Sequence, residues 1–508
     1  MASGPRALVP AGPLRLLPVI LLAAAALRAL AWQHTLMMTG DGPDFLWQAQ
    51  RMLAGDWADA LSHHYHPLYA LLSAGAGLLL GDVVAGAVLV SVAAGVAAVA
   101  AVVALARRAL PDRPDIALAA ALIATVHSAS LVFSSDVRSD GLHAALFVLC
   151  VAALVAALEQ GGWRWLAAGA AAGLAYLTRP EALFLVAPGL LAALATVPRR
   201  GAAAAARGAL GFVLALALVA APYVLAIHGL TGSWQISMKP SIAAAGLATS
   251  TGLPPGCPMA SPTVPGASEA EDGAPAGPAE AEAATATAAR LGTDLRSAIE
   301  AFVDVARADV LFFAALGLLP VMRRRRGLVY GGLAVVAGWI ALLTLHHHRS
   351  GYLDDRHLLP AALLVLPAAG AGWLALWNVR RARTAARIVC LVVVALLAIG
   401  GVKPRHFDKR PLLAALAFAR DRTPEGQRIV VERSKEGWYA ERPVLLLALP
   451  CTDEALREAM RREGAALVVL DEDSLRAAAP HWLDGSLFEL LARFREGRQS
   501  VVVLSLRG

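Results

Sequence analysis

The sequence predicts an all-α polytopic membrane protein with a small α/β domain at its C-terminal end. Of its 508 residues, 58% are hydrophobic and only 16% are charged, whereas a soluble domain is roughly 45–50% apolar and about 25% charged. The mean hydropathy is +0.59. The apolar excess lies in runs of about 15–24 residues, the length that crosses a bilayer. Charged residues become frequent again after residue 404, where short apolar runs such as "RIVV" and "ALVVLDE" alternate with helical patterns.

The apolar runs of the first 402 residues predict about eleven transmembrane helices. Two runs, 165–177 and 310–322, are short, because about thirteen residues cover about 20 Å of a hydrocarbon core about 30 Å thick. The second run could extend back to Ile299, and the first could form a tight pair with the run that follows it. The predicted crossings are 16–33, 83–106, 115–133, 142–158, 165–177, 182–197, 208–228, 310–322, 327–345, 358–379 and 388–402.

Lys and Arg residues predict the orientation. They cluster in every second connection, for example at Arg199 and Arg200, and they are sparse in the connections between. Because basic residues mark the cytoplasmic side, we expect the N-terminus inside and the C-terminus outside, in the inner (plasma) membrane. Ala29 and Ala31 form an A-x-A pattern that would alternatively mark the first run as a cleaved signal peptide. A retained helix is the preferred interpretation, and cleavage would leave the same loops outside.

Two domains follow from this layout: a membrane domain, 1–404, and an extracytoplasmic α/β domain, 405–508. In the membrane domain, residues 34–82 form a first outer loop with two helices expected to lie in the membrane interface. Residues 229–309 form a long outer loop. Its stretch 250–290 is rich in Ala, Pro, Gly, Glu, Ser and Thr. That composition buries too little apolar surface to offset its ordering entropy, so a flexible segment is expected there.

Charge and cysteine usage exclude other classes of protein. The net charge is +7, but the basic residues stand in short clusters between apolar runs, unlike a groove that follows nucleic-acid phosphates. We therefore expect membrane lipids and no nucleic acid among the partners. Four cysteines cannot form a disulfide framework. Cys150 and Cys390 lie inside apolar runs and are interpreted as small packing residues. Cys257 and Cys451 both lie on the predicted outer side of the membrane and could pair.

Carboxylates and histidines gather at the predicted outer ends of the spans. Ion-coupled transporters normally keep charged groups near the membrane midplane, but the interiors of these runs hold almost no acidic residues. This pattern favours an outward-facing active site at the membrane surface. The polar residues concerned are Asp41, Asp44, Asp56, Asp59, His63, His64, His66, Asp136, Asp140, Glu181, His346, His347, His348, Asp354 and Asp355.

Four segments in order resemble a known family. They are the loop from Asp41 to "HPLYALL" (66–72), "SSDVRSDGLHAALF" (134–147), "AYLTRPEALFL" (175–185) and "DDRHLLPAALLVLP" (354–367). Together they resemble GT-C glycosyltransferases, and more closely the family 39-like branch of protein O-mannosyltransferases, lipid A aminoarabinose transferases and lipopolysaccharide galacturonic acid transferases. The resemblance covers roughly residues 13–402. It departs from the family where Gly42 follows Asp41, at Asp140, where the family often has Glu, and at His357, where Tyr is usual.

The resemblance implies a GT-C fold and transfer of a sugar from a polyprenyl phosphate to an acceptor hydroxyl on a lipid, glycan or protein. Asp41 is then the general base that takes the hydroxyl proton. Asp140 is a second acid that orients the acceptor or holds a metal. The alternative for Asp41 or Asp44 is to cap the helix that starts near Phe45, and Asp140 could similarly cap the helix at 142–158.

Arginines suit phosphate because their planar guanidinium groups bind it bidentately. Arg356 and Arg179 are the first candidates for the donor phosphate, and Lys239 is a third. The alternatives are pairing of Arg356 with Asp354 or Asp355, pairing of Arg179 with Glu181, and a solvated Lys239. The residues expected to contact acceptor or sugar are Asp44, His66, Tyr69, Glu181 and His357.

No cofactor is certain. "HHYH" (63–66) and "HHHR" (346–349) could hold a divalent metal ion, with His63, His64 and His346 as ligands, but their spacing matches no known ligand motif. A polytopic transporter or lipid flippase is the alternative function, and it would predict charged residues inside the spans and internal repeats. A membrane scaffold whose outer domain binds a partner is a third interpretation, in which the loop acids would be freely replaceable.

Overall fold

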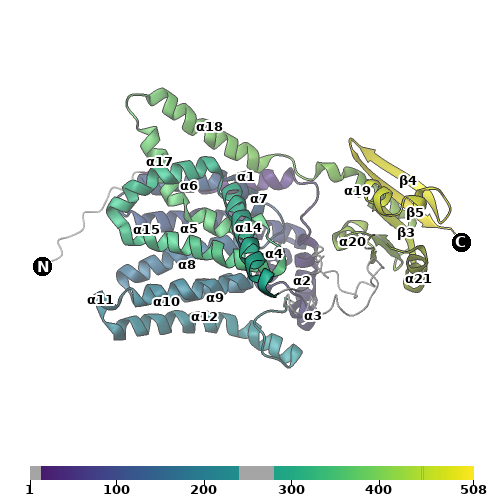
Figure 1. Ribbon diagram of the computed structural model, residues 1–508, viewed down its shortest axis with the longest axis horizontal. Helices are drawn as coiled ribbons and strands as arrows, with labels where there is room; N and C mark the ends of the chain where they lie inside the picture. The colour runs from purple at the N-terminus through teal and green to yellow at the C-terminus, as the bar shows by residue number, and fades with distance from the viewer. Residues whose placement is uncertain (1–12, 240–279, 448, 450, 508) are drawn as a thin grey trace. The chain divides into compact units, whose positions relative to one another are not determined.

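The computed structural model describes residues 13–239, 280–447, 449 and 451–507. They form two compact units (Figure 1). The first contains the described residues up to Trp32, the segment Met52–Lys239 and the described residues from 280 to Lys403. The second joins Gln33–Arg51 to the chain from Pro404 onward. The open question of whether Cys257 and Cys451 pair is not answered here, because Cys257 lies outside the described residues.

The first unit is a bundle in which most helices fall on the predicted apolar runs. Three helices, Trp57–Ser62, Pro67–Leu80 and Glu280–Ala306, lie in the predicted outer loops instead. Among the described residues, six helical segments are long and apolar enough to cross a membrane, and a bent pair makes up to seven. The protein is thus membrane-embedded and mostly helical, as predicted, whereas the count of eleven stays a prediction. The helices are α1 (Leu17–Gln33), α3 (Trp57–Ser62), α4 (Pro67–Leu80), α5 (Val83–Ala109), α6 (Pro114–Val126), α7 (Ser128–Phe133), α8 (Asp140–Gln160), α9 (Arg164–Tyr176), η2 (Pro180–Leu185), α10 (Val186–Leu194), α11 (Val197–Arg200), α12 (Ala202–Thr231), α14 (Glu280–Ala306), α15 (Ala308–Ser350), η3 (Asp355–Leu358), α16 (Leu359–Leu364), α17 (Leu366–Trp377) and α18 (Arg383–Val402).

Three predicted spans differ in detail from the structure. The runs 310–322 and 327–345 belong to one helical segment, α15, which is broken where Arg325 leaves helical backbone angles. The run 358–379 is a helix pair, α16 and α17, bent by 58°. Pro367 stands in the first turn of α17, where a ring without an N–H favours a new helix start over continuation.

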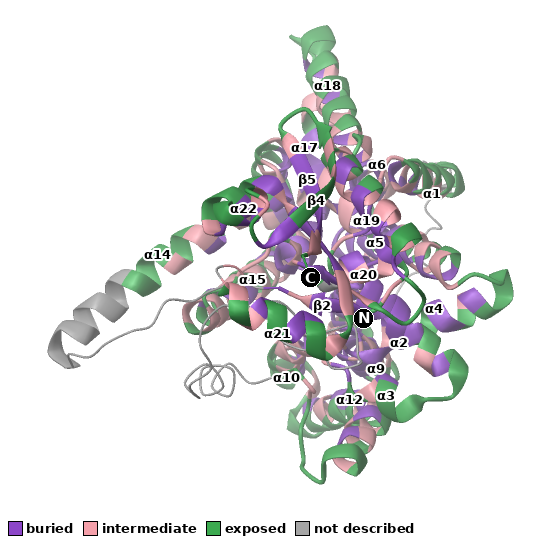
Figure 2. Cartoon of the chain, turned by 90° about the vertical axis from the view of Figure 1, so that its right-hand side faces the viewer, coloured by how far each residue is buried: buried purple, intermediate pink, exposed green. Residues whose placement is uncertain are grey.

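Small residues let the bundle helices approach closely. A Cβ atom added at Gly317 of α15 would lie 1.9 Å from the carbonyl oxygen of Ala368, and one at Gly372 of α17 would lie 1.9 Å from that of Phe313. Such contacts are how helices associate in a membrane, where apolar side chains gain nothing by leaving lipid. Buried residues surround α5, whereas α18 is largely exposed (Figure 2), as expected of a helix that faces lipid.

The second unit contains the predicted α/β domain. Its five-stranded sheet has the order β2–β1–β3–β5–β4, in which β1, β2 and β3 are parallel and β3, β5 and β4 are antiparallel. Apolar residues of the strands are buried against helices on both faces. The elements are η4 (Phe407–Lys409), α19 (Arg410–Arg422), β1 (Arg428–Val431), α20 (Ser434–Ala440), β2 (Val444–Leu446), α21 (Asp453–Glu463), β3 (Ala465–Asp471), α22 (Glu472–Ala478), η5 (Pro480–Leu483), β4 (Phe488–Glu496) and β5 (Gln499–Leu506).

The same unit includes the segment that follows α1. Thr35 forms an isolated parallel bridge with Arg405. The Leu36 N–H donates to the Arg405 carbonyl at 3.1 Å, and the Arg405 N–H donates to the His34 carbonyl at 2.8 Å. Helix α2 (Gly42–Ala54) begins six residues after Leu36. The first part of the predicted outer loop is therefore built onto the C-terminal domain.

Candidate functional site

A chain of ion pairs joins three connections of the helix bundle. The Asp140 carboxylate lies 3.0 Å from Arg138 Nε and directly contacts Arg179 Nη1. Arg179 Nε is 3.6 Å from Glu181 Oε2, and Glu181 Oε1 is 3.5 Å from Lys239 Nζ. We call Arg138, Asp140, Arg179, Glu181 and Lys239 the ion-pair cluster. Asp140, Arg179 and Glu181 are site residues predicted from two separate segments of the sequence, and Lys239 is predicted from the long outer loop.

Asp140 is held by arginines rather than by helix capping. It is the first residue of α8, whose preceding residue Ser139 makes no side-chain cap. Its side chain is only 2% exposed, so its charge must be balanced by a partner. Arg138 and Arg179 supply that balance, and Arg356 also lies within electrostatic range. The capping alternative therefore does not describe this carboxylate.

His66 connects three elements beside the cluster. Its Nδ1 lies 2.6 Å from the Tyr176 carbonyl, and its Nε2 lies 3.0 Å from Ser237 Oγ. A carbonyl only accepts, so Nδ1 carries the proton and Nε2 accepts from Ser237. Burial is the main cause that lowers the pKa of His66 to about 4. The His66 side chain is therefore neutral, and its two hydrogen bonds hold the segment that leads to Lys239.

The chain near Lys239 is held by further contacts. Tyr176 Oη donates to the Ile236 carbonyl, and Lys239 N–H donates to Ser237 Oγ at 3.1 Å. The Lys239 side chain is 43% exposed, against 12% for Arg179. Lys239 is thus the most exposed cation of the cluster, anchored by its backbone and paired through its ammonium group with Glu181.

Arg356 stands at the start of η3 with a partner of its own. Its Nε lies 3.1 Å from Asp354 Oδ2, as the alternative from sequence anticipated, and its Nη2 donates to Tyr352 Oη at 3.1 Å. His357 completes a capping box with Asp354, and its carbonyl accepts from Trp339 Nε1 at 2.8 Å. The buried His357 lies within electrostatic range of Glu181, which places this segment close to the cluster.

Tyr69 is fully buried inside the bundle. Its hydroxyl donates to the Ala87 carbonyl at 3.1 Å, lies 2.7 Å from Ser91 Oγ, and accepts from the Arg138 N–H at 3.1 Å. The hydroxyl thus supports the backbone of Arg138, two residues before Asp140. The predicted contact of Tyr69 with sugar or acceptor stays a prediction, and the contact that the structure shows is this support of the Arg138 backbone.

Arg138 is the site residue that sequence analysis missed. It is not among the candidate residues named from the sequence. Its position two residues before Asp140, in the stretch "DVRSD", was the available signal, because an arginine so close in sequence to a buried acid can pair with it. The arginines and lysine of the cluster exceed its two acids by one positive charge. An anion that approaches the exposed Lys239 would meet a net positive surface.

Asp41 and Asp44 belong to the second unit. Asp41 precedes α2, and its carbonyl accepts from the Phe45 N–H at 3.2 Å, in the first turn of that helix. Asp44 is buried within α2. Burial, with the neighbouring charge of Asp41 as a second cause, raises the pKa of Asp44 to about 7. Near neutral pH the pair therefore does not readily carry two full negative charges.

The histidine runs do not form a metal site in the described residues. His63 and His64 stack with ring centroids 4.3 Å apart, and His63 Nδ1 accepts from the Tyr65 N–H at 3.2 Å. His346 lies beside His357 with centroids 6.4 Å apart. Within the part of the chain that is described, no three His, Cys, Asp or Glu side chains are arranged to hold a metal ion. These histidines therefore do not fit a metal centre.

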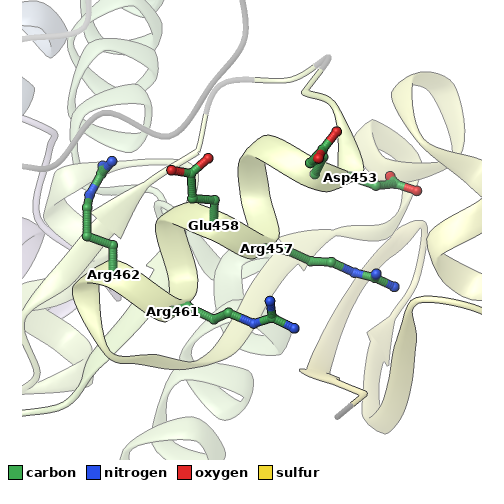
Figure 3. A pocket seen from close by; sticks show the side chains of 6 residues that line it. Asp453, Arg457, Glu458, Arg461 and Arg462 are labelled. Carbon is green, nitrogen blue, oxygen red and sulfur yellow. The ribbon is translucent and has the colours of Figure 1, made fainter.

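A hollow on α21 of the second unit is lined by charges of both signs (Figure 3). Its lining residues are three acids and three arginines of a single helix, and acids and arginines recur at spacings of three and four residues. This arrangement is typical of a solvated helix face. It lacks the excess of one charge that marks the ion-pair cluster, and we assign it no ligand.

Comparison with known proteins finds one family model that matches part of the chain. Residues 64–225 match the family model described as "Dolichyl-phosphate-mannose-protein mannosyltransferase". The match spans Asp140, Arg179 and Glu181, and it begins after Asp41. No curated protein matches the sequence significantly.

Solved structures share the fold at low sequence identity. ArnT from Cupriavidus metallidurans bound to undecaprenyl phosphate is similar with a TM-score of 0.62 and 14% identity, over 97% of this chain and 98% of that one. The Archaeoglobus fulgidus oligosaccharyltransferase tethered with an acceptor peptide gives 0.60 and 13%, over 98% and 74%. The arabinofuranosyltransferase AftD from Mycobacteria gives 0.52 and 14%, over 97% and 40%.

Proposed function

Starting from the GT-C fold that this chain has, we propose that the protein transfers a sugar from a polyprenyl phosphate to an acceptor hydroxyl. The acceptor class is a lipid, a glycan or a protein. The observation that carries the proposal is the ion-pair cluster: a buried acid between two arginines, with an exposed lysine and one excess positive charge. All of its members except Lys239 lie in the segment that matches the mannosyltransferase family model.

The related structures support a lipid-linked donor. ArnT was solved with undecaprenyl phosphate bound, and the archaeal oligosaccharyltransferase AglB was solved in complex with a dolichol-phosphate and an inhibitory peptide. A donor of this kind brings an anionic phosphate to the membrane surface, where a net positive cluster would stabilise it. We further propose that this surface is the outer face of the inner membrane, as the distribution of basic residues predicts.

In the proposed reaction the acceptor oxygen attacks the anomeric carbon. The bond between that carbon and the phosphate oxygen breaks, and the polyprenyl phosphate leaves with the bonding electrons. Asp41 takes the proton from the acceptor hydroxyl and later releases it to water. Arg179, Lys239 and Arg356 stabilise the charge that develops on the leaving phosphate. Asp140 keeps Arg179 oriented, and Glu181 keeps Lys239 in place.

The experiment is sugar transfer by the full-length protein in membranes. Labelled polyprenyl-phosphate sugars and a native lipid extract are supplied to the wild type, to Asp41→Asn and to Asp59→Asn. Asp59 is an exposed acid of α3 and serves as a matched control. We expect turnover by the wild type and the control and a loss of at least about 100-fold in Asp41→Asn. Full activity of Asp41→Asn at normal expression would reject Asp41 as the base.

Absence of turnover with every donor would count against the transferase class. The same panel includes a known GT-C enzyme, which must be active for that conclusion. Movement of the lipid-linked donor across proteoliposomes without transfer would then support the transporter or flippase alternative.

A further inference from the structure

The Asp41 segment is attached to the C-terminal domain by a side chain as well as by backbone pairing. The Met38 N–H donates to Tyr439 Oη at 2.7 Å. Residues 34–36 pair with Arg405 through the two backbone hydrogen bonds described above. Three hydrogen bonds thus hold the five residues that end three positions before Asp41. A buried backbone N–H needs such a partner, because leaving it without one carries the full cost of its lost hydration.

The attachment continues to Asp41 through a close contact. Met38 is only 5% exposed, and its side chain covers Gly42. A Cβ atom at position 42 would lie 2.7 Å from Met38 Sδ, 2.8 Å from Met38 Cγ and 3.1 Å from Met38 Cβ. The first two distances are too short for any pair of carbon or sulfur atoms, so the observed position of Met38 requires glycine here. This gives a physical reason for the departure from the Asp-Glu pair often found in the resembling family.

The backbone on both sides of Asp41 is fixed as well. The Gly42 N–H donates to the Thr39 carbonyl at 3.0 Å and closes a turn around Asp41. The Phe45 N–H then donates a hydrogen bond to the Asp41 carbonyl in the first turn of α2. A shift of Met38 would therefore pass directly to the turn that carries the Asp41 side chain.

Tyr439 is a well-supported anchor. It lies on α20, which packs against α19, β1 and β2, and its ring contacts the buried apolar cluster around Leu416 and Val431. The ring can stay in that cluster when the hydroxyl is removed. Tyr439→Phe therefore deletes the acceptor for Met38 and leaves the packing in place.

We propose that the C-terminal α/β domain fixes the Asp41 loop, with Tyr439 as a positioning residue that acts through Met38 and Gly42. The proposal rests on the proposed function for the consequence to turnover, but the attachment itself is independent of that function. The domain then supports the loop that carries the proposed base. Loss of the hydrogen bond between Tyr439 and Met38 lowers the rate constant of the chemical step more than it lowers the affinity for the donor.

Hydrogen–deuterium exchange of the full-length protein in nanodiscs tests the attachment directly. We expect slow exchange in peptides that cover residues 34–42 of the wild type, and exchange about fivefold faster or more in Tyr439→Phe. Tyr330→Phe is the matched control, because Tyr330 is an exposed tyrosine of α15. Equal exchange in Tyr439→Phe and the control would overturn the proposal, whatever the enzyme does.

Sugar-transfer kinetics test the consequence for the reaction. For Tyr439→Phe we expect kcat to fall about tenfold with little change in the donor KM, since small displacements of a reacting group are costly. A second pair of variants flanks Asp41. Gly42→Ala should lower kcat because its Cβ displaces Met38, whereas Gly40→Ala should be tolerated because a Cβ there meets no atom within 4 Å.

The outcomes separate the two proposals. Unchanged kcat in both Tyr439→Phe and Gly42→Ala, with Asp41→Asn inactive, would overturn the positioning role and leave the proposed function standing. Faster exchange in Tyr439→Phe with full activity of Asp41→Asn would keep the attachment and reject Asp41 as the base.

Discussion

Nε of Arg28 donates a hydrogen bond to Ser134 Oγ at 2.7 Å, from a guanidinium group that is fully buried in the helix bundle. Nη2 donates to Ser130 Oγ at 3.1 Å and Nη1 to the Ala24 carbonyl at 3.0 Å. A Cβ atom at Gly95 would lie 2.0 Å from Arg28 Nε, so α5 leaves room for this side chain. Arg28 therefore ties α1 to the segment that leads to Asp140.

Replacing Arg28 by lysine should destabilise the bundle, because one ammonium group cannot reproduce a planar fork that reaches two serines. We expect a loss of about 1–3 kcal/mol, measured as a lower melting temperature in detergent. Arg15→Lys, at an exposed position before α1, should leave the melting temperature unchanged. Equal stability of Arg28→Lys and the wild type would show that the fork geometry is not required.

Alanine at Gly317 or Gly372 should reduce folded protein strongly. Each new Cβ would collide with a carbonyl oxygen of the facing helix at 1.9 Å, so α15 and α17 would have to separate and lose their contacts. Gly331→Ala is the control on α15, because a Cβ there meets no atom within 4 Å. Yield of monodisperse protein in size-exclusion chromatography is the measurement, and similar yields for all three variants would contradict the close packing.

Replacing Lys239 by glutamine should weaken donor binding. The ammonium group is the accessible cation of the ion-pair cluster, and its removal leaves the cluster with no excess positive charge. We expect the donor KM to rise about tenfold with a smaller change in kcat. Arg349→Gln removes an exposed positive charge at the end of α15 and should have no such effect. An unchanged KM in Lys239→Gln would remove Lys239 from the phosphate site.

The stability of the second unit should depend on pH through Glu436. Burial, and then the charge of Glu432, raise the pKa of Glu436 to about 7, although Arg433 and Lys435 favour the charged form. Because the pKa is raised in the folded state, the protonated form of Glu436 stabilises the folded protein. This stabilisation is fully present below about pH 4.5 and is lost as pH rises through 7. Glu436→Gln should remove a pH dependence on the order of 3 kcal/mol.

The measurement for Glu436 is the denaturant midpoint of the full chain between pH 5 and pH 8. Glu425→Gln, at an exposed position of the same unit, should leave the slope intact. A wild-type midpoint that does not fall over this range would show that Glu436 is ionised without cost in the folded protein.

The sequence predicts the fold class well because long apolar runs leave few alternatives to membrane helices. It also brings together Asp140, Arg179 and Glu181, since each stands next to the end of a predicted span. The break at Arg325 was not predictable from hydropathy, because the backbone of one residue decides it. Likewise, the hydrogen bond from the Met38 N–H to the Tyr439 hydroxyl leaves no local sequence pattern. Only the departure from the resembling family at Gly42 hints at it.

Gly42 shows how such a departure can be interpreted. From sequence it marked a difference from the resembling family at the position after Asp41. In the structure, Met38 occupies the space that a side chain at position 42 would need. Tyr69 shows the opposite case, because its place within "HPLYALL" suggested a ligand contact, whereas its hydroxyl lies among backbone groups inside the bundle.

The hydrogen bond between Met38 and Tyr439 joins residues 401 positions apart. At a ribosomal rate of about 5–20 residues per second, about 20–80 seconds separate the appearance of the two residues. During this interval the Asp41 segment has left the first helix but lacks its anchor. A nascent chain, or one that terminates anywhere before Tyr439, would insert its helices and still lack the hydrogen bond that anchors the Asp41 segment. The attachment of the Asp41 segment thus has to wait until the C-terminal domain has been translated.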